Sequence, residues 1–141
     1  MLGTKTYEKK YMDACQANIT GQLKAYNELL AQTNGNAVEN FELLFFNNLV
    51  VVLDAFFVHR LRGLEGKYGN PLNEVRVLAN SILYNKSIMN EDNTIKMKPE
   101  NSVRKLKLGD TIKFTQPQFT LLAKMFFEEI QKKYSQPKVY L

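Results

Sequence analysis

The segment FELLFFNNLVVVLDAFFVHRLRGLEGKYGNP, residues 41–71, determines how this chain folds. Between Phe41 and Leu61 its apolar side chains surround almost the whole axis of a helix, rather than one face of it. A helix of this kind lies at the centre of a bundle or is covered by a partner subunit. Residues 49–53 taken alone would also suit a buried strand, but their helical flanks favour a helix. We therefore predict a central helix over residues 37–64.

Amphipathic segments on both sides of this helix predict three more helices. Apolar residues recur at three- and four-residue steps in residues 6–32, in residues 71–84 and again after residue 115. This spacing places the apolar side chains of each segment on one face of a helix. The chain is therefore expected to form a bundle around the central helix.

Capping residues mark the starts of these predicted helices. Asn36, with Glu39 three residues later, fits a capping box before the central helix. Asn70 stands directly before Pro71, and an asparagine cap followed by proline in the first turn is a strong start signal. Thr115 is the expected cap of the last helix.

Two short segments in the second half follow a different period. Residues 94–98 and 110–114 alternate apolar and polar side chains, which is typical of strands with one buried face. The predicted fold is mainly α, a four-helix up-and-down-like bundle with a short β-hairpin between the third and fourth helices. We expect a single domain over residues 1–141, because no linker divides the chain.

The composition excludes several classes of site. The chain has 141 residues, of which 45% are hydrophobic, with one Cys and one His. One Cys cannot form an internal disulfide or a Cys-rich zinc site, and one His cannot form a multi-histidine metal site. The first twelve residues contain no apolar signal-peptide core, and the run at 49–53 is too short to span a bilayer. We expect a cytoplasmic protein without membrane partner, metal or cofactor.

The net charge of +5 lies entirely in the second half of the chain. Residues 1–67 hold 7 basic and 7 acidic residues, whereas residues 68–141 hold 12 basic and 7 acidic ones. The basic residues concentrate on and around the predicted hairpin, with two aromatic residues nearby. They are Lys96, Lys98, Arg104, Lys105, Lys107 and Lys113, with Tyr84 and Phe114. This pattern suits nucleic acid, or else an ordinary solvated face whose lysines discourage sheet aggregation.

A dense polar cluster follows the central helix. Its candidate ligand-binding residues are Asp54, His59, Arg60, Arg62, Lys67, Asn70 and Asn73. If the helix continues to residue 64, then Asp54, His59 and Arg62 share one arc of it and Arg60 lies apart. One interpretation is a structural network, because buried charges need partners. The other is a site for a carboxylate or phosphate between the second and third helices, with donors at the helix start behind Asn70.

Catalysis is a further step that the sequence leaves undecided. Histidine is the usual general acid or base near neutral pH, so His59 is the candidate. Asp54 and Glu65 could orient it, but neither stands three or four residues away on one helix. The loop around Lys67 lacks the spacing of a P-loop. No catalytic residue is therefore assigned.

The stretch from Phe45 to Ser81, together with residues 93–115 and the last helix, resembles a family of small uncharacterised bacterial proteins, mostly from actinobacteria. The resemblance implies no activity. Helical nucleases of the HEPN class carry an arginine, then four to six other residues, then a histidine. With His59 in that role the arginine would stand at positions 52–54, which hold Val, Leu and Asp, so the signature is absent.

Three functions remain open from the sequence. The first is a small binding or interaction protein with an anionic ligand. The alternative is a nucleic-acid-associated protein or hydrolase that uses the His59 and arginine cluster with the basic hairpin. The third is a structural subunit in which the polar cluster only packs. Surplus apolar surface on the central and last helices also predicts a homodimer.

Overall fold

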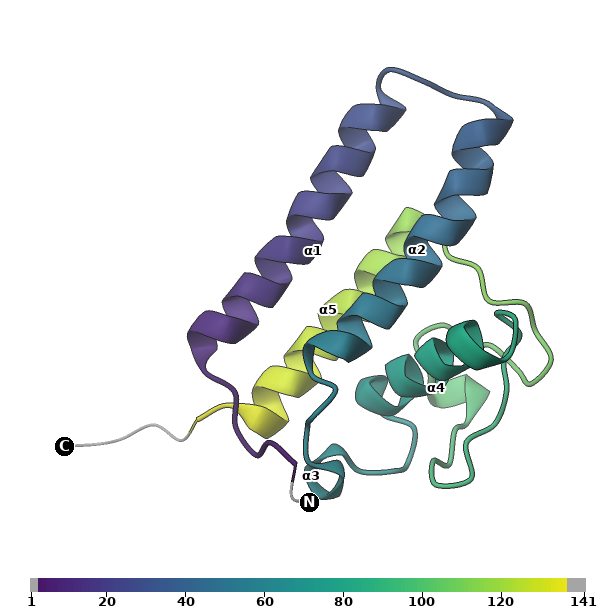
Figure 1. Cartoon of the computed structure of the whole chain (residues 1–141). Helices are drawn as coiled ribbons and strands as arrows, with labels where there is room; N and C mark the ends of the chain where they lie inside the picture. Colours follow the sequence, from purple (N-terminus) through teal and green to yellow (C-terminus); the bar gives the residue numbers. More distant parts are fainter. Residues whose placement is uncertain (1–2, 137–141) are drawn as a thin grey trace.

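The computed structural model describes residues 3–136, and they are mainly helical, as predicted (Figure 1). Four long helices and one short one carry the fold. They are α1 (Lys9–Leu30), α2 (Asn36–Phe56), α3 (Arg62–Glu65), α4 (Pro71–Tyr84) and α5 (Gln116–Tyr134). One further 3-10 turn spans Pro99–Asn101 in the long connection between α4 and α5.

The helix α2 lies at the centre of the packing. It contacts α4 most extensively, and it also contacts α5 and α1. Leu49, Val50 and Leu53 are at most 2% exposed, and the whole run is helical rather than a strand. Large side chains of α5, among them Phe119 and Phe126, complete the core against it. Figure 1 shows α1, α2 and α5 side by side along much of their length, with the shorter α4 beside α2.

The N-terminal segment lies along the chain that leaves α2. Thr4 forms a parallel bridge with Arg60. The Thr4 amide donates to the carbonyl of His59 over 2.6 Å, and the Leu61 amide donates to the carbonyl of Thr4 over 2.9 Å. Gly3 lies so close to this segment that a Cβ would stand 2.6 Å from the Leu61 Cα. Residues 59–61 are therefore extended and held from one side.

The prediction that the central helix reaches residue 64 is wrong, because α2 ends at Phe56. Phe57 leaves the helical region, with φ −129° and ψ 33°. Its carbonyl accepts from the guanidinium of Arg60 over 3.0 Å. If the helix continued straight through these residues, the chain could neither pair with Thr4 nor bury Arg60. The predicted cap at Asn36 also shifts by one residue, since Gly35 is the N-cap.

The predicted β-hairpin is wrong as well. Within residues 3–136, segments 94–98 and 110–114 form no strands and do not pair. Thr111 instead bridges to Ile88, and the Ile112 amide donates to the carbonyl of Ser87 over 2.7 Å. The alternation has a simpler cause: Ile95 and Phe114 are buried in the core separately, while the neighbouring lysines face solvent.

The other two predicted caps are confirmed. The Asn70 side chain accepts from the Asn73 amide, with Pro71 in the first turn of α4. Thr115 and Gln118 form a complete capping box at the start of α5. In the described part of the chain, no helix is long and apolar enough to cross a membrane.

Candidate functional site

Arg60 and Asn73 are the buried members of the seven candidate residues, 2% and 0% exposed. The side chain of Arg60 has no exposed surface. One guanidinium nitrogen lies 2.9 Å from the Asp54 carboxylate, and Nε lies 2.8 Å from the Glu65 carboxylate. With the carbonyl of Phe57 and a longer contact to the carbonyl of Leu72, all of its nitrogens have partners. Arg60 therefore offers no donor to an external ligand.

Glu65 is the centre of this charge network. Its side chain is fully buried, and it also pairs with Arg76 over 2.6 Å. The second carboxylate oxygen accepts from the Asn73 amide group over 2.8 Å. Burial alone would raise the pKa of Glu65, but the hydrogen bonds and charges of Arg76 and Arg60 outweigh it and hold the pKa below its ordinary value. Glu65 is therefore ionised in the folded protein at neutral pH.

Asn70 and Asn73 hold the start of α4 against the short α3. The Asn70 side chain accepts from the Asn73 amide over 3.0 Å and donates to the carbonyl of Glu65 over 2.6 Å. The side-chain Oδ1 of Asn73 accepts from the Gly69 amide over 2.9 Å. Lys133, from α5, also donates to the Glu65 carbonyl over 2.9 Å. These groups bond within the protein, so Asp54, Arg60, Asn70 and Asn73 form a structural network.

His59 and Arg62 lie elsewhere, on an open groove of 550 Å³. We call it the His59 groove, and it is lined by Gly3, Thr4, Val58, His59, Arg60, Leu61, Arg62 and Gly63. His59 is exposed, and 49% of the Arg62 side chain is exposed. One Arg62 nitrogen donates to the Thr94 hydroxyl over 3.1 Å, and Nε lies 4.0 Å from Glu65. None of the lining residues carries a carboxylate, and Arg62 supplies an exposed positive charge that the nearby Asp92, whose pKa it lowers, offsets in part.

Lys67 is exposed and belongs to a third region. Its Nζ lies 5.9 Å from the centroid of the Tyr68 ring, and Nζ of Lys96 lies 5.7 Å from the same centroid. Tyr68 is 70% exposed. The fold thus brings a lysine from the polar cluster beside a lysine from the segment predicted as a hairpin.

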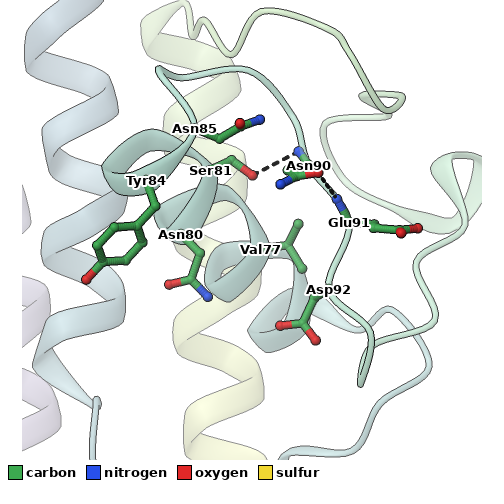
Figure 2. Close-up of a pocket in the computed structure, with 8 residues that line it drawn as sticks. All are labelled: Val77, Asn80, Ser81, Tyr84, Asn85, Asn90, Glu91 and Asp92. Carbon is green, nitrogen blue, oxygen red and sulfur yellow. Dashed lines mark hydrogen bonds between the residues drawn. The ribbon is translucent and has the colours of Figure 1, made fainter.

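A smaller polar cavity of 270 Å³ lies between α4 and residues 90–92 (Figure 2). Its lining combines a buried serine, an exposed tyrosine, asparagines and two carboxylates. The lining residues are Val77, Asn80, Ser81, Tyr84, Asn85, Asn90, Glu91 and Asp92. The Asn90 amide donates to the Ser81 hydroxyl over 3.0 Å, which fixes one wall. None of these lining residues is basic, and none belongs to the seven candidates.

Several residues of these regions are absent from the predicted site. Arg76 is not among the predicted residues, and Glu65 was considered only as a partner for His59. Glu74 accepts the amides of Val103 and Arg104, each over 2.8 Å, and is 2% exposed. Charged residues inside an otherwise apolar helix, as in the sequence NEVRV at 73–77, were the signal that could have found them.

The geometry provides nothing that orients His59 as a catalyst. Within residues 3–136 its side chain has no hydrogen-bond partner, and the carboxylates of Asp54 and Glu65 are bound to arginines instead. The same residues contain no group of three His, Cys, Asp or Glu side chains that could hold a metal ion. The exposed side chains of Arg62 and His59 can donate hydrogen bonds to a ligand in the groove.

Comparisons with known proteins add no analogy to this geometry. The chain matches no protein family, no curated protein and no solved structure.

Proposed function

We propose that the protein is a small binding protein that takes an anionic ligand, a carboxylate or a phosphate, in the His59 groove. The observation that carries the proposal is the exposed guanidinium of Arg62 on a groove whose lining residues carry no carboxylate. Arg60 and Arg76 are paired with the carboxylates of Asp54 and Glu65. Arg62 lies 4.0 Å from Glu65 and its charge lowers the pKa of Asp92, but 49% of its side chain stays open to solvent.

The buried network occupies two of the three arginines and leaves the guanidinium of Arg62 at the groove. Arg60 and Arg76 donate to the buried carboxylate of Glu65. Arg62 donates to Thr94, and its other guanidinium N–H groups remain available to a ligand. His59 lines the same groove from three residues away and adds a second polar side chain. A guanidinium and an imidazole on a water-accessible groove are donors of the kind that bind carboxylate and phosphate oxygens.

Titration of the purified protein with pyrophosphate and with citrate, followed by calorimetry, tests the proposal. We expect saturable binding that Arg62→Ala weakens by about 10-fold or more, because a charge-assisted hydrogen bond is lost. His59→Ala should weaken it to a smaller extent. Lys24→Ala on α1 is the matched control, since it removes one exposed positive charge far along the chain from the groove.

Two outcomes would contradict the proposal. One is the absence of binding heat for both anions. The other is an equal effect of Arg62→Ala and Lys24→Ala, which would show that only the overall charge matters. Thermal melting of each variant confirms that the loss of binding does not reflect loss of folding.

We further propose that the protein forms a homodimer through the outer end of the α1–α2 pair. This end projects past the start of α5 in Figure 1. Phe41, Leu43 and Leu44 are 42%, 46% and 68% exposed there, and Leu29 of α1 is 45% exposed. A second copy of the chain offers the same apolar patch, as a two-fold interface requires.

Light scattering after size-exclusion chromatography tests this part. We expect a dimer that Leu44→Glu converts to a monomer, because a charge in an apolar interface is costly. Leu121→Glu is the control, since Leu121 of α5 is 50% exposed outside this patch. A monomeric wild-type protein, or equal effects of the two variants, would refute the dimer.

A further inference from the structure

Two lysine ammonium groups lie close to the exposed ring of Tyr68. The two ammonium groups lie within 6 Å of the ring centroid, 5.9 Å for Lys67 and 5.7 Å for Lys96. We call Lys67, Tyr68 and Lys96 the Tyr68 surface. An aromatic ring that remains 70% exposed contributes little to the core. A planar group can stack on this ring by displacing a lysine ammonium group from over its face, and the displaced lysine can then pair with an anion beside that group.

The backbone beneath the Tyr68 surface is fixed, although the side chains are exposed. The Lys96 amide donates to the carbonyl of Lys67 over 2.7 Å, which joins two segments far apart in the sequence. Gly69 is buried with φ +90°, and a Cβ there would stand 3.3 Å from the carbonyl oxygen of Lys96. Only glycine adopts this conformation readily and allows this approach. The three side chains are therefore presented together by a rigid base.

The Tyr68 surface is linked to the His59 groove through Thr94. Arg62, which lines the groove, donates to the Thr94 hydroxyl over 3.1 Å. Thr94 stands two residues before Lys96 in the chain. Arg62 is thus joined to Thr94, and Lys96 is joined to Lys67 by a backbone hydrogen bond. The Thr94 hydroxyl also donates to the carboxylate of Asp92 over 2.6 Å.

We propose that the anionic ligand is a single-stranded nucleic acid, with a phosphate bound at Arg62 in the groove and a base stacked on Tyr68. This inference rests on the proposed function and names its ligand class. Repeated phosphates match a series of separate cations, and every base has a flat face that stacks on an aromatic ring. A duplex keeps its bases stacked inside, so it can use the cations but not the ring.

Fluorescence anisotropy with a labelled oligo-dT of about 12 nucleotides tests the stacking. We expect Tyr68→Ala to weaken binding by about 10-fold, within the range found for the loss of one stacked base. Tyr68→Phe keeps the ring and should retain affinity. Tyr84→Ala is the matched control, because Tyr84 is 83% exposed and lines the cavity of Figure 2 rather than the Tyr68 surface.

The salt dependence of the same titration tests the lysines. Removal of one phosphate contact to a single strand should reduce the steepness of log K against log salt concentration by about 0.7. We expect that change for Lys67→Ala and for Lys96→Ala, and no change for Lys24→Ala. Equal slopes in all three variants would contradict the proposed contacts.

Three results would overturn the inference. One is pyrophosphate binding without oligonucleotide binding. Another is unchanged oligonucleotide affinity in Tyr68→Ala while Arg62→Ala weakens it, in which case the groove binds anions and the ring plays no part. The third is equal affinity for a duplex of the same length, since charge alone would then explain binding. Failure of the proposed function itself looks different, because neither pyrophosphate nor citrate would then bind.

Discussion

Arg60 and Glu65 form an ion pair at 2.8 Å in which neither side chain has any exposed surface. Arg60 lies in the segment between α2 and α3, and Glu65 is the last residue of α3. Through Arg76 and Lys133 the same pair reaches α4 and α5. A charge pair at this depth costs desolvation, and removal of one partner leaves the other uncompensated. The pair therefore specifies how the chain leaves the central helix.

Replacement of Glu65 by glutamine should destabilise the protein strongly at neutral pH. The neutral amide of Glu65→Gln would leave Arg60 and Arg76 with only Asp54 as a charge partner, and we expect a loss of about 3–5 kcal/mol in the free energy of unfolding. Chemical denaturation measures it. Asp13→Asn is the control, because Asp13 pairs with Lys9 on the surface, where its side chain is 57% exposed, and such pairs contribute little.

The pH dependence of this loss has a definite sign. The pKa of Glu65 is held below its ordinary value of 4.5, so its ionised form stabilises the fold above that pH. This contribution disappears as the pH falls through the lower, native pKa. The difference between wild type and Glu65→Gln should therefore shrink in acid. A difference that stays constant from pH 7 down to the acid transition would contradict the network.

Glu74 should show the opposite pH dependence. Burial raises its pKa above the ordinary value of 4.5, and the amides of Val103 and Arg104 only partly offset this. The native protein then binds the Glu74 proton more tightly than the unfolded chain does. The contribution of Glu74 to the free energy of unfolding therefore increases as the pH falls from above the native pKa toward 4.5. When wild type and Glu74→Gln are denatured across this range, the free energy of unfolding of the wild type should increase relative to that of the variant as the pH falls. A difference independent of pH would contradict the raised pKa.

The helices could be predicted because their signals are local. The apolar run at 49–53, the Asn70 cap and the Thr115 cap each depend on neighbours within one or two turns. The prediction of a hairpin failed because the alternation of apolar and polar residues indicates which side chains are buried, but it does not indicate which backbone segments pair. Ile95 and Phe114 reach the core from segments that do not meet as strands.

The site was only partly predictable for a related reason. The positions of His59 and Arg62 were inferred from a helix that was assumed to continue, whereas the chain unwinds at Phe57. Arg60 was expected to lie apart from the polar arc, yet it is the buried residue. Its network depends on Arg76, which stands 11 residues beyond Glu65. A contact between two residues that are 11 positions apart and separated by a loop produces no periodic pattern in a single sequence.

Tyr134→Phe should cost about 1 kcal/mol in the free energy of unfolding. The buried Tyr134 hydroxyl donates to the carbonyl of Leu61 over 2.7 Å, and its loss leaves a polar oxygen without this partner. Burial raises the pKa of Tyr134 to about 12, so the hydroxyl remains a donor through neutral and mildly alkaline pH. Tyr84→Phe is the control, because Tyr84 is 83% exposed. Equal stability of the two variants would show that the bond to Leu61 contributes nothing.

Gly3→Ala should detach the N-terminal segment from the wall of the His59 groove. The new methyl group would lie 2.6 Å from the Leu61 Cα and 2.9 Å from the carbonyl oxygen of His59, and backbone cannot move aside as a flexible side chain can. We expect a loss of about 1–3 kcal/mol, typical of an overpacked position. Faster hydrogen exchange is expected at the Leu61 amide, which donates to Thr4.

Gly21→Ala is the matched control for this substitution. Gly21 lies within α1, and a Cβ there has no atom within 4 Å, so alanine should stabilise the helix by about 0.5–1 kcal/mol. The two changes add the same methyl group and should act in opposite directions on the denaturation midpoint. If Gly3→Ala also left the midpoint and the Leu61 exchange rate unchanged, the segment at residues 3–4 would not be held against residues 59–61 in solution. The groove would then lack the wall that Gly3 and Thr4 provide.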